Sequence, residues 1–356
     1  MVNKQRQPLR TAVIGYGLAG SAFHAPLIAA TDGLVVTAIV TGNADRTAAA
    51  RDRYPGVVVL SSADELWRAP ELVDLVVIAS PNQSHLSLGL SALGAGLPVV
   101  IDKPIAATVA AAEQLQRAAA GRGLMLSVFH NRRWDGDLRT ALRLIEEGVL
   151  GTVHRLESRF ERWRPALRAG SWREDPAAEE AGGLLYDLGS HLIDQALVLL
   201  GPVRSVYAEL RLIRPGAQVE DDVFLALSHA DGGVSHLWAS AVTADIGPRL
   251  RVLGSTAAYV KYGLDGQEVA LRAGGAPGDV GWGREPQTNW GRLGTPEDSR
   301  PVATEAGAYE QYYAGVRDAL LAGTQPPVTI EQAIEVLKVI EAAQHSGRTG
   351  STIAVA

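Results

Sequence analysis

Two short stretches of the sequence hold residue types from which a hydride-transfer site can be built. Lys103 follows a short apolar run, and Asp187 and His191 lie four residues apart in a later segment. Oxidation of an alcohol removes the hydroxyl proton as well as a hydride, and histidine is the usual base because its ordinary pKa lies near neutral pH. A lysine ammonium bound to the same oxygen would stabilise the developing alkoxide. We therefore predict that all three residues are catalytic, with His191 as base and acid, and that oxidation rises with pH as His191 loses its proton.

Each of these residues also has a simpler interpretation. Asp187 could be only the N-cap of a helix predicted from Ser190 to Leu200, and His191 could be an ordinary core histidine. If Asp187 does act in the site, it could bind a neighbouring hydroxyl or orient and charge-tune His191 or Lys103. The spacing leaves these roles open.

A glycine loop lies upstream, between a β-rich run at Thr11 to Ile14 and an apolar helical pattern. Gly15 permits a tight turn, Gly17 lets the backbone approach a pyrophosphate, and Gly20 allows the helix to pack closely on the strand. A tight turn without a ligand would use similar glycines. The residues expected to hold the cofactor here are Gly15, Gly17, Leu18, Ala19 and Gly20.

Alternation of strands and helices gives the loop its context. Further apolar runs cover residues 35–40, 57–60, 75–78, 99–101 and 124–129, with helix-like segments between most of them. This order is typical of right-handed βαβ units and a parallel, doubly wound sheet. The sequence therefore predicts an α/β protein with an N-terminal Rossmann domain over residues 1–130.

Open α/β sheets bind ligands at the carboxyl ends of their strands. Residues after the second, fourth and fifth strands are therefore expected to contact the cofactor, namely Thr41, Gly42, Asn43, Arg46, Pro81, Asn82, His85, Asp102 and Lys103. An NAD-selective site would place a carboxylate after the second strand to bind the ribose 2′-hydroxyl, and none is present there, so we expect NADP to be preferred over NAD. Arg46 could instead be an exposed helix charge, Asn82 an N-cap and His85 a packing residue.

Composition and pattern change at His130, and residues 131–356 form the predicted second domain. Its strand-like runs follow one another with short turns, which indicates an α+β domain with a large open, mostly antiparallel sheet. One face of such a sheet would lack helices of its own chain, so we expect a homodimer or homotetramer. Residues 273–301 are predicted to be an irregular loop.

Composition excludes several classes of protein. At 356 residues the chain is long enough for about two domains of roughly 150 residues. A net charge of −6 with scattered basic residues gives no reason to bind nucleic acid or an anionic membrane. The absence of cysteine excludes disulfides and zinc-thiolate sites, and no metal site is predicted. Without a signal-like apolar segment at the amino terminus, we expect a cytoplasmic location.

These motifs, in this order, resemble the glucose-fructose oxidoreductase / inositol dehydrogenase / MocA family over essentially the whole chain. That family carries a glycine loop, a Glu-Lys-Pro motif, here Asp102-Lys103-Pro104, and a later Asp-x-x-x-His pair, here Asp187 and His191. Three further stretches resemble its branch of NADP-dependent scyllo-inositol 2-dehydrogenases, namely residues 23–26, 129–134 and 261–268. The resemblance implies a Rossmann domain, a substrate domain and hydride transfer to or from a cyclic polyol or sugar. Asp102 departs from the usual glutamate, but Lys103 is intact and we expect the chemistry to survive.

The substrate site is less well defined by sequence. Candidate substrate-binding residues are Lys103, Arg133, Trp134, Trp163, Asp187 and His191. Arg159 and Trp172 could join them, although surface salt bridges and core packing explain the arginines and tryptophans as well. Two other functions stay open, a catalytically silent NADP-sensing protein and a reductase of a non-sugar carbonyl.

Overall fold

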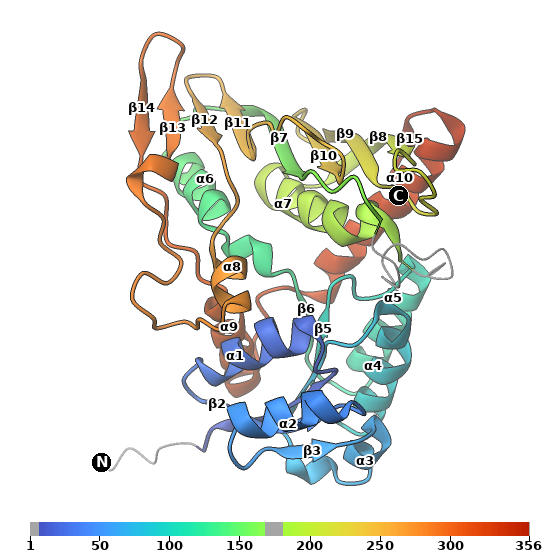
Figure 1. The fold of residues 1–356 in the computed structure, drawn as a ribbon. Coiled ribbons are helices and arrows are strands. Elements are labelled where there is room, and N and C mark those ends of the chain that lie inside the picture. Colours follow the sequence, from blue (N-terminus) through green and yellow to red (C-terminus); the bar gives the residue numbers. More distant parts are fainter. Residues whose placement is uncertain (1–6, 168–180, 356) are drawn as a thin grey trace.

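The computed structural model describes residues 7–167 and 181–355, and its first half contains a six-stranded parallel sheet in the order β3-β2-β1-β4-β5-β6 (Figure 1). The strands are β1 (Leu9–Ile14), β2 (Leu34–Val40), β3 (Val58–Leu60), β4 (Leu75–Ile78), β5 (Val99–Asp102) and β6 (Leu126–Phe129). Every residue of β4 is buried, which explains why the strand is a continuous apolar run. The strand order reverses between β1 and β4, and this confirms the doubly wound fold.

Helices connect these strands. They are η1 (Ala19–His24), α1 (Ala25–Ala29), α2 (Ala44–Arg53), α3 (Ala63–Trp67), η2 (Pro70–Leu72), η3 (Asn82–Ser84), α4 (His85–Gly94) and α5 (Val109–Ala120). The glycine loop leads into η1, which is a π-helical turn and continues into α1. Asn43 and Thr108 cap α2 and α5, with each side chain accepting a backbone N–H of the first turn.

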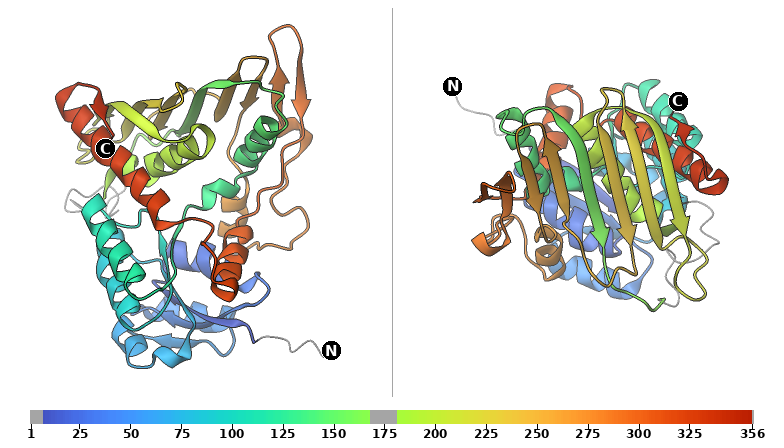
Figure 2. Two further views of the ribbon diagram at one scale, coloured as in Figure 1. Left: turned by 180° about the vertical axis from the view of Figure 1, so that it is seen from behind. Right: turned by 90° about the horizontal axis from the view of Figure 1, so that it is seen from above.

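The second half of the chain forms a nine-stranded sheet in the order β14-β13-β12-β11-β7-β10-β9-β8-β15. Its strands are β7 (Val153–Glu161), β8 (Val203–Arg211), β9 (Asp222–His229), β10 (Val234–Ser240), β11 (Leu250–Gly254), β12 (Ala258–Lys261), β13 (Gly291–Gly294), β14 (Ser299–Val302) and β15 (Ile353–Ala354). β7 and β10 pair in parallel and the other neighbours are antiparallel, so the expected mixed, mostly antiparallel sheet is confirmed. Figure 2 shows its strands across the top of the molecule with helices beneath.

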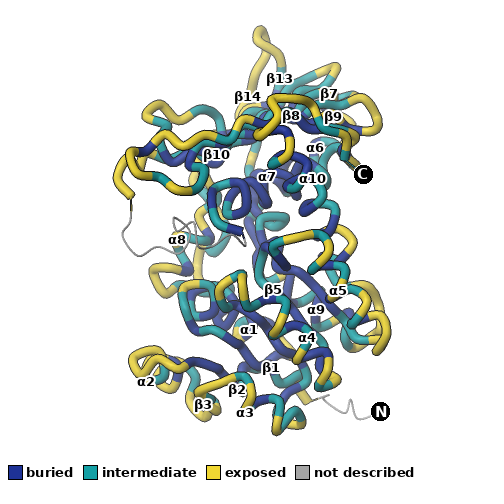
Figure 3. Tube along the Cα trace, turned by 90° about the vertical axis from the view of Figure 1, so that its right-hand side faces the viewer, coloured by how far each residue is buried: buried dark blue, intermediate teal, exposed yellow. Residues whose placement is uncertain are grey.

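The helices of this half are η4 (Asn131–Trp134), α6 (Gly136–Glu146), η6 (Leu185–Gly189), α7 (Ser190–Leu200), α8 (Gln267–Arg272), η7 (Gln287–Asn289), α9 (Glu310–Ala322) and α10 (Ile330–Thr349). α10 begins with a capping box between Thr329 and Gln332. It packs on α5 of the first half and on α7 and β8 of the second. The buried trace runs through the central strands and α7 (Figure 3), so α7 is held firmly where it reaches the site.

Residues 273–301 differ from the expected irregular loop. Part of this segment forms β13, and β14 begins at Ser299, so the two strands extend one edge of the sheet. Strands of four residues that include glycine and proline carry too little alternation to be recognised in the sequence. Trp282 is partly buried and its Nε1 donates to Glu310 Oε2 at 2.9 Å. Within the described ranges, no helix is long and apolar enough to cross a membrane, and no group of three potential metal ligands is found.

Candidate active site

The glycine loop is shaped by close backbone contacts on two sides and open space on the third. A Cβ on Gly15, whose φ is +92°, would lie 2.8 Å from the carbonyl oxygen of Ala79, and a Cβ on Gly20 would lie 2.0 Å from the Gly15 oxygen. At Gly17 the nearest atom would be Nη1 of Arg46, 3.8 Å away. Packing therefore requires glycine at Gly15 and Gly20. Gly17 instead leaves room for a ligand, and the Arg46 guanidinium faces this open space.

Leu18 and Ala19 follow this open position. Leu18 is 48% exposed, and Ala19 begins η1, whose first backbone bond runs from Ser21 N to Gly17 O at 2.9 Å. No acidic residue lies in the first turn. The amino end of the helix is thus suited to an anion such as a pyrophosphate.

The residues after β2 lie on the same side as Arg46. Thr41 is buried and its hydroxyl accepts the N–H of Asn43 at 3.4 Å, while Asn43 Oδ1 caps the N–H of Arg46 at 2.9 Å. The Thr41 hydroxyl proton, the Asn43 amide and the Arg46 guanidinium are the donors of this corner, and Gly42 lies between them. No carboxylate lies between β2 and the start of α2.

The polar side chains after β4 mainly contact backbone carbonyls. Pro81, rather than Asn82, is the N-cap of η3, and Asn82 Nδ2 donates to the carbonyl of Ala181 at 3.3 Å. His85 is fully buried, with Nδ1 2.8 Å from Pro104 O and Nε2 2.9 Å from Ser80 O. The expected contact of His85 with the cofactor is therefore corrected, because both ring nitrogens face backbone carbonyls of the loops after β4 and β5.

β5 ends at Asp102 and delivers Lys103 to the space between the two halves of the chain. Asp102 Oδ1 accepts the backbone N–H of Lys103 at 2.8 Å. Lys103 Nζ lies 2.6 Å from the carbonyl oxygen of Asp187 and 3.2 Å from its Oδ1. Both side chains keep some exposure, 15% for Lys103 and 23% for Asp187. The structure thus brings two of the three predicted catalytic residues together.

Asp187 lies inside the π-helical turn η6, and Gly189 is the N-cap of α7. The interpretation of Asp187 as a simple N-cap is therefore wrong. Its Oδ2 also lies 3.8 Å from Arg162 Nη2. Asp187 is held by cations, and its arrangement fits the role of orienting Lys103.

His191, in the first turn of α7, is 6% exposed, and its Nδ1 has no hydrogen-bond partner among the described residues. Burial lowers the pKa of His191 well below 6.5, and the positive charges of Lys103, Arg132 and Arg249 act in the same direction. The imidazole is therefore neutral at and below neutral pH. This differs from the expectation that oxidation rises with pH as His191 loses its proton.

The two arginines after β6 have different roles, which their sequence did not reveal. Arg133 donates hydrogen bonds from Nε and Nη2 to the carboxylate of the buried Asp194, at 3.0 and 2.7 Å. Its Nη1 donates to Gln332 at 2.8 Å. The expected substrate contact of Arg133 is therefore corrected, since this guanidinium ties η4 to α7 and α10.

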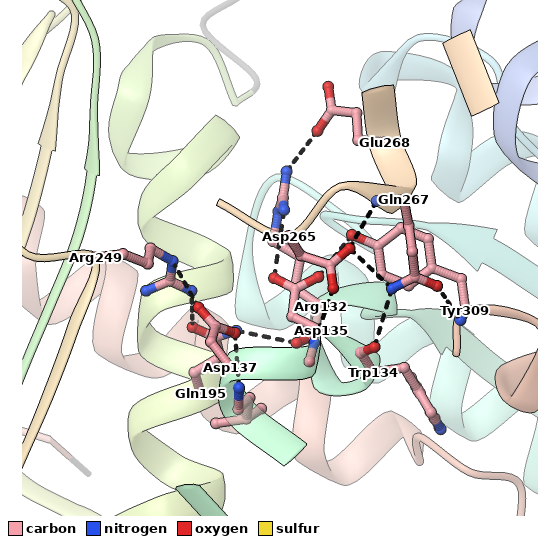
Figure 4. Close-up of polar contacts among 12 residues, drawn as sticks. Arg132, Trp134, Asp135, Asp137, Gln195, Arg249, Asp265, Gln267, Glu268 and Tyr309 are labelled. Carbon is pink, nitrogen blue, oxygen red and sulfur yellow. Dashed lines mark hydrogen bonds and ion pairs between the residues drawn. The ribbon is translucent and has the colours of Figure 1, made fainter. Parts of the chain in front are cut away.

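Arg132, which was not among the predicted site residues, lies close enough to His191 for its charge to lower the pKa of that histidine. Its Nη2 lies 2.6 Å from Glu268 Oε2 and its Cζ lies 4.7 Å from the ring centroid of Phe160, whose ring is 6.3 Å from that of His191. Arg132 Nε has no hydrogen-bond partner among the described residues. Figure 4 shows Arg132 within a buried polar network that includes Asp135. Burial raises the pKa of Asp135 to about 7, against the effect of Arg132.

The predicted aromatic residues lie in different surroundings. Trp134 is partly buried and stacks edge-on against Tyr312, with ring centroids 5.6 Å apart. Trp163 is 57% exposed and forms an isolated antiparallel bridge with Val242. Arg159 lies over Trp238 on the sheet at 3.9 Å, and Trp172 lies outside the described residues.

The residues present fit a nicotinamide dinucleotide. Gly17 leaves a cradle that a Cβ would fill, and Arg46 faces it. Lys103 and His191 lie beyond the carboxyl edge of β5, next to the switch point between β1 and β4. Fold and site together define a two-domain, dinucleotide-dependent oxidoreductase.

Comparison with known proteins agrees with this class. The family model described as "Oxidoreductase family, NAD-binding Rossmann fold" matches residues 9–130, and the "GFO/IDH/MocA C-terminal domain" matches residues 138–260. The chain therefore belongs to the GFO/IDH/MocA family of NAD(P)-dependent oxidoreductases, and the resemblance seen in the sequence is confirmed.

Several relatives match over nearly their whole length. The scyllo-inositol 2-dehydrogenase (NADP(+)) IolW of Bacillus subtilis is 36% identical over 97% of this chain and 95% of its own. The oxidoreductase YdgJ of Escherichia coli is 40% identical over 98% and 99%. The solved structure of the oxidoreductase yvaA of Bacillus subtilis has a TM-score of 0.91 at 34% identity, covering 98% of this chain and 99% of that one.

Proposed function

We propose that the protein is an NADP-preferring dehydrogenase that acts on a CH–OH group of a cyclic polyol or sugar, such as scyllo-inositol or an inosose. The observation that carries this proposal is the Lys103–Asp187 contact beside a buried, neutral His191. The name of the relative IolW, a scyllo-inositol 2-dehydrogenase, supports the substrate class.

The proposed mechanism assigns one task to each of the three residues. His191 accepts the proton of the substrate hydroxyl during oxidation and returns it during reduction. Lys103 donates a hydrogen bond to the same oxygen, and Asp187 keeps Nζ in place through two contacts. The cations near His191 also favour an alkoxide over an alcohol. When bound, the nicotinamide accepts or supplies the hydride.

NADP preference is supported by the corner after β2. A 2′-phosphate needs donors and a cation, and Thr41, Asn43 and Arg46 offer these without a carboxylate between β2 and α2. Leu18 and Ala19 would offer backbone N–H groups to the pyrophosphate.

The test is a panel of inositols, inososes and aldoses, with NADPH absorbance as the readout. We expect turnover of at least one cyclic polyol or its ketone, and little with non-sugar carbonyls. Lys103→Ala and His191→Ala should each lower kcat by about 10²-fold or more while NADPH still binds, because general acid-base catalysis is worth ~10² to 10⁴. Full turnover by His191→Ala, or turnover confined to non-sugar carbonyls, would contradict the proposal.

A homodimer or homotetramer is also proposed. Its support is the outer face of the nine-stranded sheet, where Phe224 and Trp238 lie with ring centroids 5.2 Å apart. Aromatic residues on a large open sheet are typical of a subunit interface.

A further inference from the structure

A buried histidine lies directly behind the lysine of the proposed site. His24, the last residue of η1, is fully buried between Asp102 at the end of β5 and Tyr313 of α9. Its Nδ1 is 2.5 Å from the Tyr313 hydroxyl, and its Nε2 is 3.8 Å from Asp102 Oδ1. The ring of Phe129 lies against it, with centroids 4.4 Å apart. Three segments that are distant from His24 in sequence, β5, β6 and α9, therefore hold this one side chain.

The chemistry of these neighbours assigns the protons. A carboxylate can only accept, so the His24 nitrogen that faces Asp102 carries the proton, and Nδ1 then accepts from the Tyr313 hydroxyl. The Tyr313 hydroxyl thus donates toward His24, and the Nε2–H of His24 points toward Asp102. His24 Nε2 makes no full hydrogen bond to any described residue, so its effect on Asp102 is exerted across the 3.8 Å gap.

Asp102 carries this effect to Lys103. Burial acts to raise the pKa of Asp102, but His24, Lys103 and His85 together outweigh burial, so the pKa is lowered and the carboxylate stays charged. The same Oδ1 that faces His24 accepts the backbone N–H of Lys103 at 2.8 Å. Loss of the His24 donor would make the ionised form of the buried Asp102 less stable. The hydrogen bond from the Lys103 backbone N–H to Asp102 would then weaken.

We propose that His24 is a positioning residue for Lys103. It acts through its contact with Asp102, whose carboxylate fixes the backbone from which the lysine projects. This inference rests on the proposed function only for its kinetic consequence. Because His24 belongs to the helix that follows the glycine loop, the same contact joins the cofactor half of the site to the lysine.

The first experiment is a double-mutant cycle with a matched control. His24→Leu and Asp102→Asn should each lower kcat by about 10-fold, which is within the range of coupling between contacting residues, with NADPH affinity within about 3-fold of the wild type. The double variant should be no worse than Asp102→Asn alone, because both changes break one chain of contacts. His229→Leu removes another buried histidine, on β9, and should leave kcat unchanged even if it lowers the melting temperature.

The second experiment needs no substrate. The lysines of the chain are Lys4, Lys103, Lys261 and Lys338, so the rate at which an amine-acylating reagent labels Lys103 can be measured against Lys338 by mass spectrometry. The ratio should rise by about 3-fold or more in His24→Leu and Asp102→Asn, but not in His229→Leu. An unchanged ratio in folded His24→Leu, or additive losses of kcat, would overturn the inference.

The two experiments also separate this inference from the proposed function. A wild type that turns over no polyol or sugar would refute the proposed substrate class, whereas the labelling ratio would still decide the role of His24. If His24→Leu does not fold, His24→Gln, which keeps a polar side chain, takes its place in the cycle and in the labelling.

Discussion

At the scale of single residues, the charges around His191 determine how activity responds to pH. Burial and nearby cations keep the pKa of His191 well below 6.5, so its base form is present throughout the neutral range. Asp135, whose pKa is about 7, is the neighbouring group that changes charge there, and it lies 3.4 Å from Arg132. As pH rises through 7, Asp135 gains a negative charge and neutralises part of the field of Arg132.

We therefore expect kcat for polyol oxidation to show a modest inflection near pH 7 that belongs to Asp135. Initial rates between pH 5.5 and 9 should become flat over this range in Asp135→Asn. An inflection near pH 6.5 that persists in Asp135→Asn would mean that His191 titrates in the neutral range after all.

Arg132 and Arg133 offer a comparison of adjacent positions. Arg133→Lys should lower the melting temperature, because Lys cannot form the two parallel bonds to the buried Asp194 and about 1.5–3 kcal/mol of hydrogen bonding to a charged group is at stake. Its kcat should stay within about 3-fold of the wild type.

Arg132→Lys should have the opposite profile, with kcat/KM lowered by about 10-fold and a smaller change in melting temperature. Steady-state kinetics and thermal unfolding on the same preparations provide the comparison. Equal effects of the two substitutions on kcat/KM would refute the distinction.

This pair also shows where prediction from sequence stops at the residue scale. Lys103, Asp187 and His191 were found because each follows a motif, and the structure brings Lys103 and Asp187 into contact. The choice between Arg132 and Arg133 depends on the direction of successive side chains in the short η4 helix, which no periodicity in the sequence reveals. His85 was misassigned because its partners are backbone carbonyls, which any sequence supplies.

At the scale of elements, the strands were predicted to within about two residues wherever an apolar run was bounded by turn residues. The exceptions were β13, β14 and β15, which have two to four residues and too little pattern to detect. The π-helical turns η1 and η6 were also missed, because one extra residue in a turn does not alter composition. η1 ends at His24 and η6 lies just before His191, so the positions of both histidines depend on backbone geometry that the sequence does not reveal.

The element that tests cofactor choice is α2. Arg46 and Arg51 are both exposed, but Arg46 in the first turn faces the open position at Gly17, whereas Arg51 lies in the last turn. Arg46→Ala should weaken NADPH binding by about 10-fold, the loss expected for one charge-assisted contact to a phosphate, and leave NADH binding unchanged.

Arg51→Ala is the matched control and should alter neither affinity. Titration of cofactor fluorescence measures all four values. If Arg46→Ala weakens NADH and NADPH equally, the guanidinium serves the pyrophosphate common to both and does not select NADP.

At the scale of the whole molecule, the described residues cover one side of the nine-stranded sheet with helices and leave the other side open (Figure 2). Its inner residues, such as Leu225 and Leu237, are fully buried against α7 and its neighbours. The alternate residues carry an aromatic cluster in which Trp238 lies 5.2 Å from Phe224 and 6.2 Å from His236, with Arg159 stacked over the indole. Side chains of this kind on a broad sheet bury themselves against a partner because the released water outweighs the entropy of association.

We therefore expect light scattering to report a dimer, or a dimer of dimers, at micromolar concentration. Trp238→Lys should shift the population toward the monomer, because an ammonium at the centre of the face would be desolvated without a partner. Val58→Lys on β3 places the same charge on an exposed apolar residue of the other sheet and should leave the assembly unchanged. A wild type that stays monomeric would contradict the prediction that the open face is a subunit interface. Equal dissociation by both substitutions would point to net charge as the cause.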